Sequence, residues 1–561
     1  MEIFSTRTDA TVTPASVKLF AIYDPSLSHS EEDSDQQIVV FIPSDVDVNT
    51  KTRKVGLMQG IFQFCDNYTQ GAQLNHVALE DGYVLYTVLE SRYHCILQIE
   101  CTRVEDDDGV EYRKFDIAPV NYLHQLIYRG YDHFRLHHGT IQSLWESMSR
   151  DECTRFLTKW WHIWTTQLDL HMNGEGILKL TDSYRRSQLR FDSEVSSNVD
   201  VLREKYGFKD FLVWDPQVDN VDEFGLIYEH SKKLQTCSKV RLLHWLEELV
   251  HYGITSESLT SSNIITQDSQ LNKAIAHSDE TIYDPFKMVL STINDVSSIA
   301  GITAGVNTGI KAMSQGVEYL NGYLPWGKGV EPAITDVVSD KTTSETPFLI
   351  GSLGEAITYK NVYLQFEDCN DEKLYRIVIF KSEGKLIILI FEFNVNTLNE
   401  LQFYSQLAKD LVQFTRGNRS HASNVVAKKR HLHYILFDTL KRRLDTNLPM
   451  ILSVDKDDEH YDVKHPDDLE NSRMQSIIVH RELANMFQHD PEHSERLIRT
   501  KNGWWCYETT ESNKKVIIIK RWHAPSDKRE SSSNGSGILD SSTDMLGSIA
   551  LEAKLLLERF T

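Results

Sequence analysis

The first seventy residues combine two short apolar runs with one long amphipathic segment. The runs at residues 17–23 and 37–42 are rich in strand-forming side chains, and an acidic loop at 28–35 joins them. Short apolar runs bounded by polar turns are typical of buried β-strands. The pattern therefore predicts two neighbouring strands, which a helix follows.

The predicted helix spans residues 51–68 and contains no proline. Its apolar side chains recur at helical spacing and cover roughly half of the circumference; they are Val55, Leu57, Met58, Ile61, Phe62, Phe64, Cys65 and Tyr68. A single sheet needs only about a third of that arc. We expect part of this apolar face to contact a partner chain.

The same order of elements recurs along the chain. The first unit continues with predicted strands at 74–79, 83–89 and 95–103 and helices at 118–136 and 140–172. The second has predicted strands at 208–214, 223–229, 348–353, 362–367, 374–381 and 385–394 and helices at 239–252 and 398–414. The third has predicted strands at 432–437, 450–454, 496–500, 504–509 and 515–522 and helices at 474–488 and 543–560. Repetition of one architecture indicates three related units.

These units predict an α/β (α+β) fold with mixed or antiparallel sheets and flanking helices. The predicted boundaries are 14–173 for the first domain, 174–200 for a linker, 201–427 for the second domain with a long insertion at about 236–346, and 428–561 for the third domain.

Composition restricts the kinds of partner. The chain of 561 residues carries a formal net charge of -22, whereas phosphate binding needs clustered Lys and Arg, so we expect no nucleic-acid partner. The seven cysteines form no C-x-x-C pair. No basic-then-apolar leader and no apolar run of about 18 residues is present. We expect a protein of the reducing cytosol.

Sequence motifs of common enzymes and metal sites are weak or missing. The segment 322–329 nearly spells a phosphate-binding loop, but Gly329 stands where the motif requires Ser or Thr, and Pro325 lies inside the loop. His431 and His433 share one face of a strand without a third ligand at suitable spacing. Nucleophile elbows and H-E-x-x-H motifs are absent. We predict no cofactor, no metal and no covalent catalysis.

Several segments carry a family resemblance. Residues 19–27, the Glu-Glu-Asp that follows, the Ile-Val-Val-Phe run at 38–41 and Arg-Lys-Val-Gly-Leu at 53–57 resemble the calcium-caffeine-zinc sensitivity proteins. That family supplies the Ccz subunit of Mon-Ccz vacuolar fusion complexes. The resemblance extends to residues 122–139, 347–353 and 432–443, so it touches all three units.

The resemblance implies three longin domains and a heterodimer with a Mon subunit through the first longin domains. It implies a guanine-nucleotide exchange factor for the late-endosomal or vacuolar Rab GTPase, acting in fusion of endosomes and autophagosomes with the vacuole or lysosome. The protein would be cytoplasmic and peripheral on late-endosomal and vacuolar membranes. We expect helices on one face of a longin sheet, with the other face or an edge strand open to a partner.

The first helix carries the predicted Rab and partner interface. Its candidate residues are Arg53, Leu57, Gln59, Gly60, Gln63 and Phe64. An ordinary core position is an equal alternative for Leu57 and Phe64.

A second candidate surface lies inside the predicted insertion, at residues 284–325. Its apolar positions keep helical spacing opposite a Ser, Thr, Gly and Asn face, as in membrane helices that insert without charge attraction; they include Phe286, Val289, Ile293, Val296, Ile299, Val306, Ile310, Met313 and Val317. The alternative is a buried helix whose small-residue face packs on another helix.

Two dense basic clusters stand out in this acidic chain. They are Lys428, Lys429 and Arg430, and Lys441, Arg442 and Arg443. Such clusters can bind a phosphoinositide headgroup, or simply be solvated at strand ends.

Two other functional classes remain open from the sequence. A trafficking adaptor built from three longin domains would share the fold without exchange activity. An enzyme of unrecognised type is disfavoured by the missing catalytic motifs.

Overall fold

The computed structural model describes residues 11–68, 74–105, 110–172, 181–251, 347–521, 547 and 549–558. Within these ranges the gaps are 188, 192–193, 217–223, 354–355, 418–420, 423–432, 449–465, 487–494 and 501–502. The predicted membrane segment and the cluster at 428–430 therefore lie outside the described residues.

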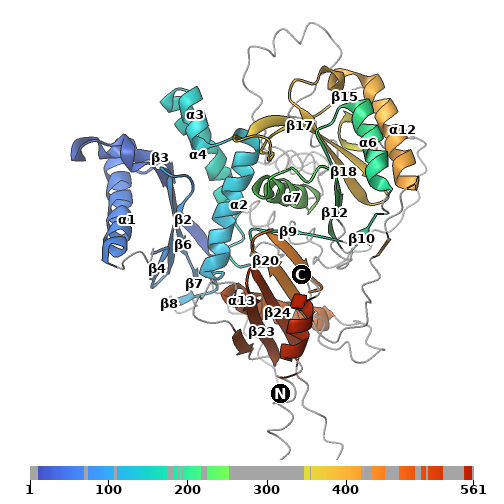
Figure 1. The fold of residues 1–561 in the computed structure, drawn as a ribbon. Coiled ribbons are helices and arrows are strands. Elements are labelled where there is room, and N and C mark those ends of the chain that lie inside the picture. Colours follow the sequence, from blue (N-terminus) through green and yellow to red (C-terminus); the bar gives the residue numbers. More distant parts are fainter. Residues whose placement is uncertain are drawn as a thin grey trace, which may run out of the picture.

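The first domain is built on a five-stranded antiparallel sheet (Figure 1). Its order is β3-β2-β6-β5-β4, with strands β2 (Ser16–Tyr23), β3 (Ile38–Ile42), β4 (His76–Leu79), β5 (Gly82–Val88) and β6 (His94–Glu100). Two short 3₁₀ helices, η1 (Pro25–Leu27) and η2 (Glu31–Gln37), occupy the acidic loop. The predicted two-strand opening of this unit is confirmed.

Helices cover both faces of this sheet. Helix α1 (Val48–Tyr68) packs on one face, and helices α2 (Val120–His138) and α4 (Arg150–Thr166) pack on the other. Of the two predicted openings, the open sheet face is therefore wrong for the first domain, and the open edge strand stays a prediction. Alternate positions of the central strands are buried on opposite sides, because Phe20 and Ile22 face α4 while Ala21 and Tyr23 face α1.

The single helix predicted at 140–172 is two helices. Helix α3 (Ile141–Ser147) ends before Met148, and α4 begins after Ser149. The Ser149 side chain accepts a hydrogen bond from the Glu152 backbone, and the Glu152 carboxylate accepts one from the Ser149 backbone. This capping box starts a new helix at that point.

A short three-stranded ribbon adjoins the first sheet. Strand β6 ends at Glu100, and the ribbon has the order β1-β7-β8, with strands β1 (Thr11–Thr13), β7 (Thr102–Glu105) and β8 (Glu111–Lys114). The strand predicted at 95–103 is therefore interrupted near Cys101, whose backbone N–H donates to the Asp81 carbonyl.

The second sheet repeats the strand order of the first. Its path is β12-β11-β18-β17, and β13 and β16 pair with the remaining edge of β17. The strands are β11 (Asp210–Asp215), β12 (Gly225–Glu229), β13 (Phe348–Ile350), β16 (Lys360–Leu364), β17 (Lys373–Ser382) and β18 (Lys385–Glu392), with the small pair β14 (Ser352–Leu353) and β15 (Ala356–Ile357) beside them. Helix α7 (Thr236–His251) covers one face, and α6 (Val195–Tyr206) and α12 (Leu401–Gly417), which follows the 3₁₀ turn η4 (Asn396–Asn399), cover the other.

The third sheet has the same order again, β22-β23-β24-β20-β21. Its strands are β20 (His433–Asp438), β21 (Arg443–Thr446), β22 (Glu495–Arg499), β23 (Trp504–Glu511) and β24 (Lys514–Arg521). Helix α13 (Pro466–Met486) packs on the inner face, and the helical residues 549–558 pack on the outer face. The predicted fold class, mixed α/β with antiparallel sheets, is confirmed.

The predicted linker at 174–200 contains strands as well as the start of α6. Strand β9 (Tyr184–Arg185) adds to the edge of the third sheet beside β21, and β10 (Leu189–Arg190) pairs with β19 (His421–Ala422). Between them, Arg186 bridges to Leu226 on the edge of the second sheet. Gly225 has a φ of +118°, and a Cβ there would lie 2.7 Å from the Arg185 carbonyl oxygen. This segment thus joins the edges of two sheets.

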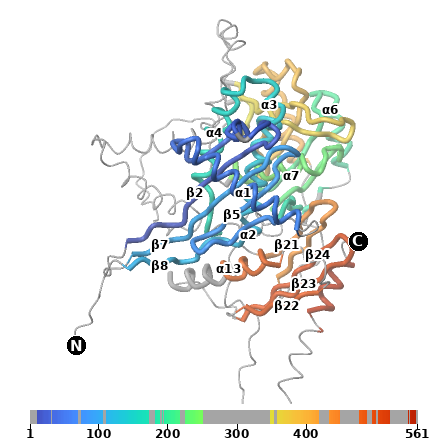
Figure 2. Tube along the Cα trace, turned by 90° about the vertical axis from the view of Figure 1, so that its left-hand side faces the viewer, coloured from blue at the N-terminus to red at the C-terminus, as the bar shows by residue number. Residues whose placement is uncertain are grey.

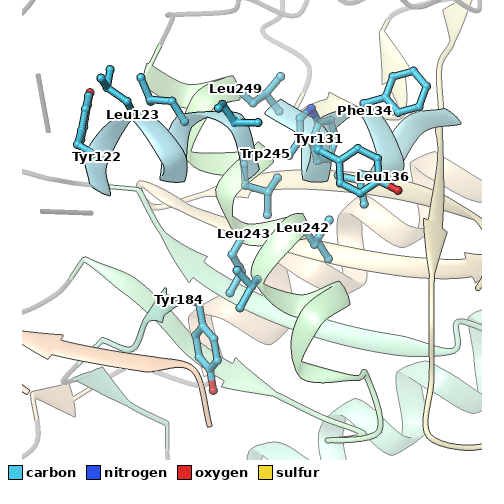
Figure 3. Close-up of a cluster of buried hydrophobic side chains, with 14 of the residues drawn as sticks. Tyr122, Leu123, Tyr131, Phe134, Leu136, Tyr184, Leu242, Leu243, Trp245 and Leu249 are labelled. Carbon is cyan, nitrogen blue, oxygen red and sulfur yellow. The ribbon is translucent and has the colours of Figure 1, made fainter. Parts of the chain in front are cut away.

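Helix α2 lies at the centre of the molecule. One continuous core contains residues from all three sheets, and α2 contributes to it from most of its circumference. Figure 3 shows part of this core, with Tyr131 of α2 and with Trp245 and Leu249 of α7, and the rings of His137 and Trp245 lie 5.2 Å apart. Strand β16 and helix α13 also contact α2, and the Asn121 amide of α2 donates to the Ala484 carbonyl over 3.4 Å.

Buried charges fix the orientation of α2 on the second domain. Arg241 of α7 forms ion pairs with Asp132 at 3.1 Å and with Glu372 at 2.7 Å. Arg135, one turn after Asp132, reaches the same Glu372 carboxylate at 3.0 Å. Burial raises the pKa of Asp132 to about 6, although Arg241 opposes the shift. Removing one member of such a buried set costs about 3–5 kcal/mol.

We expect Gly130→Ala to destabilise the fold. An added Cβ at Gly130 of α2 would lie 2.4–2.8 Å from three atoms of the Trp164 indole. Such overpacking costs about 1–3 kcal/mol, and urea unfolding would measure the loss. The control is Gly56→Ala in α1, where the added Cβ meets no atom within 4 Å. The control should be neutral or stabilising by up to about 1 kcal/mol; equal effects in both variants would contradict the packing.

We expect His244→Gln to reduce the loss of stability in acid. Burial, followed by the nearby Arg129 charge, lowers the pKa of His244 to about 3, and its Nε2–H donates to the Ser183 carbonyl over 2.7 Å. The unfolded chain binds this proton below a pH of about 6.5, so stability falls by up to about 1.4 kcal/mol per pH unit below that value. Urea midpoints at pH 7.5 and 5.5 should therefore differ less in the variant. The exposed control His29→Gln should keep the wild-type difference, and an unchanged difference in His244→Gln would contradict the assignment.

Candidate partner-binding surface

Helix α1 has a buried face and an exposed apolar face. Val55 and Phe62 are buried against the first sheet, where the Phe62 ring stacks on Tyr86 at a centroid distance of 4.4 Å. Met58, Ile61 and Cys65 are half-buried. The apolar arc predicted to exceed the needs of one sheet is therefore divided between the core and the surface.

Besides Val48 at its first position, α1 exposes three large apolar side chains to solvent. Leu57 is 59% exposed, Phe64 60% and Tyr68 74%, and the rings of Phe64 and Tyr68 lie 4.4 Å apart. Leu57, Gly60 and Phe64 follow the i, i+3, i+7 spacing that places side chains on one helix face. Together with Gly56 they define what we name the α1 stripe, namely Gly56, Leu57, Gly60, Phe64 and Tyr68.

Because they lack side chains, Gly56 and Gly60 leave the helix backbone uncovered between the large side chains of the stripe. A Cβ added at Gly56 or Gly60 would meet nothing within 4 Å. Each glycine costs a helix interior about 1 kcal/mol relative to alanine, and no contact within the described residues requires it. A second backbone could therefore approach the helix closely at this point.

Polar groups border the stripe. Arg53 and Gln63 are exposed and Gln59 is half-buried. The Asp47 carboxylate accepts a hydrogen bond from the Thr50 backbone over 2.9 Å at the start of the helix. Hydrogen bonds from Thr50 hold the pKa of Asp47 below its usual value, and the Arg53 charge adds to this. Arg53 thus offers a cation beside the stripe, and Asp47 an anion at the start of the same helix.

The floor beneath the stripe is an ordered aromatic group. The Tyr86 hydroxyl lies 2.6 Å from His94 Nδ1, and the His94 ring stacks on Tyr23 at 5.3 Å. Burial raises the pKa of Tyr86 and lowers that of His94, so both are neutral at pH 7. This support holds the buried face of α1 in place while its outer face remains open.

The structure brings the six predicted interface residues together on one helix. Five of them are exposed, namely Arg53, Leu57, Gly60, Gln63 and Phe64. Sequence reasoning left Gly56 and Tyr68 out of the predicted site. Their positions at i-4 from Gly60 and i+4 from Phe64 could have indicated them.

The other predicted sites lie wholly or partly outside the described residues, or have protein partners already. The membrane-inserting residues, the phosphate-loop-like segment and His431 lie outside the described residues. In the second basic cluster Lys441 is exposed, but Arg442 pairs with Asp182 at 2.8 Å and Arg443 with Asp445 at 2.5 Å. Those two guanidinium groups therefore have protein partners already.

Within the described part of the chain, no group of three or more His, Cys, Asp or Glu side chains is arranged to hold a metal ion. The described helices include none that is both long and apolar enough to cross a membrane.

Comparison with known proteins defines the class of the domain that carries the stripe. Residues 17–139 match the family described as the first longin domain of INTU, CCZ1 and HPS4. This range includes α1, α2 and all of the first sheet except Ser16, the first residue of β2. The first domain is therefore longin-like and similar to the domains of this family.

Curated relatives of the whole chain show the same similarity. The chain is 22% identical over 486 residues to vacuolar fusion protein CCZ1 of Eremothecium gossypii, covering 78% of this chain and 70% of the relative. It is 18% identical over 591 residues to the protein of that name from Kluyveromyces lactis, covering 88% and 91%. A zebrafish homologue, from Danio rerio, is 24% identical over 164 residues, covering 28% and 34%. The predicted resemblance to the Ccz subunits is confirmed.

Proposed function

We propose that this chain is one subunit of a heterodimeric guanine-nucleotide exchange factor. It pairs with a Mon subunit through the first longin domains and activates the late-endosomal or vacuolar Rab GTPase. The process served is fusion of endosomes and autophagosomes with the vacuole or lysosome. Similarity to proteins named for vacuolar fusion supports the process, and the exposed α1 stripe supports the protein interface.

The α1 stripe is the observation that carries this proposal. Exposed apolar side chains that gather in one patch mark interaction sites in soluble proteins. Helix α2 of the same domain is buried against the second and third domains, and the exposed side chains of α4 are polar, so α1 is the helix of the first sheet that exposes an apolar stripe. A partner helix lying along Leu57, Gly60 and Phe64 would bury two large side chains around a point of close backbone approach.

Exchange of this kind needs no covalent chemistry. The complex must bind the Rab more tightly when its nucleotide site is open than when nucleotide occupies it. By linkage, each tenfold loss of nucleotide affinity requires about 1.4 kcal/mol of additional interface energy. Rigid contacts suit this role, and α1 is held rigidly through Val55 and Phe62.

We expect Leu57→Ala combined with Phe64→Ala to weaken the complex. Loss of two interface anchors typically costs about 2 kcal/mol or more, so dimerisation with the Mon subunit or stimulated nucleotide release should fall at least tenfold. Release of fluorescent nucleotide from a panel of Rab proteins measures exchange, and co-purification measures dimerisation. The control is Val201→Ala, an equally exposed apolar residue on α6. If the double variant is folded and both activities are unchanged, the face is wrongly assigned.

The same assay separates the exchange factor from a trafficking adaptor. An adaptor built from three longin domains would form the complex but release no nucleotide from any Rab. That result would overturn the exchange activity while leaving the α1 interface intact.

We also propose that the protein acts in the cytoplasm as a peripheral protein on late-endosomal and vacuolar membranes. The segment 284–325 would insert its apolar residues, and the second basic cluster would contribute Lys441. The polar face of segment 284–325 is nearly uncharged. This favours insertion of the segment into lipid-packing defects over attraction to anionic headgroups.

We expect Ile299→Asp, Val306→Asp and Ile310→Asp together to abolish liposome flotation of the complex. Charged side chains cannot enter the acyl region at acceptable cost. Nucleotide exchange in solution should be unchanged, because the triple variant leaves α1 intact. Asn294→Asp, Ser297→Asp and Thr308→Asp form the matched control on the polar face, and they should retain most of the flotation. Wild-type flotation in the apolar triple variant would refute insertion of this segment.

A further inference from the structure

The ribbon β1-β7-β8 ends in an exposed strand. Strand β8 pairs with β7 along one edge, and in the described residues no strand pairs with its other edge. All four residues of β8 are exposed. In Figure 2 the ribbon leaves the first sheet and extends toward the N-terminus. An open edge of this kind offers backbone hydrogen bonds to another strand.

On one face of the ribbon, acidic side chains lie opposite acidic ones and basic side chains opposite basic ones. The register places Glu105 directly opposite Glu111, and Arg103 directly opposite Arg113. Like charges in directly opposite positions destabilise a sheet. Arg103 reaches Glu100 at 3.3 Å and Arg113 reaches Glu80 at 3.4 Å, both at partly exposed sites. Among the described residues no basic side chain forms an ion pair with Glu105 or Glu111.

The other face carries an apolar row across the three strands. The pairing registers align Val12, Val104 and Tyr112. Val104 is only 8% exposed, whereas Val12 is 58% and Tyr112 52% exposed. The row therefore ends at the free edge in a large aromatic side chain facing solvent.

We propose that the free edge of β8 pairs with β8 of a second copy of this chain. The two strands run antiparallel about a two-fold axis that passes between the two Tyr112 residues. Each Glu111 then lies opposite Arg113 of the second copy, and each acidic pair of one ribbon meets the basic pair of the other. The apolar rows join through the two tyrosines. Isologous contacts of this kind are the usual form of homodimer.

Symmetry and charge select this register. The two-fold axis relating the two β8 strands is perpendicular to the sheet, so each side chain stays on the same face of the sheet in both copies. Residues opposite each other must also share a face, so the allowed registers differ from one another by a shift of two residues. Moving the register by one such step places Glu111 opposite Glu111 or Arg113 opposite Arg113. The register centred on Tyr112 is the one that places opposite charges together.

The contact is small, so the association is weak. A pairing of about five residues from each chain buries less than the roughly 1,200 Å² typical of stable interfaces. The net charge of -22 on each copy opposes association. The contact should therefore form reversibly and gain strength where several copies are held on one membrane.

Charge exchange across the two-fold axis tests the proposal. The full chain is examined by sedimentation equilibrium over a concentration series, alone and with its partner subunit. Glu111→Arg and Arg113→Glu should each weaken self-association at least tenfold, because like charges then face each other. An equimolar mixture of the two single variants should recover the wild-type association, since each new charge faces its opposite in the other variant. A monomeric wild-type chain, or a mixture that fails to associate while both variants stay folded, would overturn the proposal.

Crosslinking tests the position of the axis. In Tyr112→Cys the two new thiols face each other at a Cα separation of about 4.5–5.5 Å, within the range for a disulfide. The variant should form a covalent dimer under mild oxidation. Lys114→Cys is the matched control on the same strand, because its thiol faces Val110 of the second copy and should give at least tenfold less dimer. Equal crosslinking of both variants would contradict this register. Neither test changes the α1 stripe, so failure here leaves the proposed function intact.

Discussion

The arrangement of the molecule depends on the burial of one helix, α2, by all three domains. A surface helix needs a single apolar stripe, but α2 packs on its own sheet, on α4, on α7, on β16 and on α13. The surrounding polar groups accordingly find partners across domain boundaries, through Arg241 with Asp132 and through Arg135 with Glu372. The contribution of these ion pairs is orientation more than net energy, because desolvation offsets much of the attraction between buried charges.

This constraint decides which surface of the first domain remains available. On the inner layer, α2 is enclosed by the other domains and α4 exposes only polar side chains, so the exposed apolar stripe lies on the opposite layer. That layer is α1 alone, whose inner positions Val55 and Phe62 are buried while Leu57 and Phe64 are not. An isolated longin domain could expose either layer. In the part of the chain that the structure describes, α1 is the helix of this domain that keeps an apolar stripe exposed.

Most of the elements could be predicted from the sequence, because their patterns are local. The strand and helix order of each unit follows from short apolar runs and helical spacing. Long-range pairing was harder to predict: β21 consists of Arg-Leu-Asp-Thr, a weaker strand pattern than the apolar run at 450–454, and it is a strand because β20 and β9 flank it. Likewise β9 has two residues and no periodicity of its own, so only its position between two sheet edges makes it a strand.

The candidate site shows a related limit. The sequence gives the width of the apolar arc on α1, and that width exceeds one sheet, but it does not say which half faces inward. Alternation in the central strands settles this, since Ala21 and Tyr23 present a surface that fits Val55 and Phe62 and leaves Leu57 at the far side. The net charge of the whole chain also fails to predict the charges at these surfaces: the chain is acidic overall, yet Arg53 borders the stripe and the β8 edge alternates Glu111 with Arg113.

Because α1 and β8 belong to different layers of one domain and share no residue, a contact at one surface leaves the other open. A heterodimer formed through α1 could therefore associate further through β8 without rearranging the core around α2.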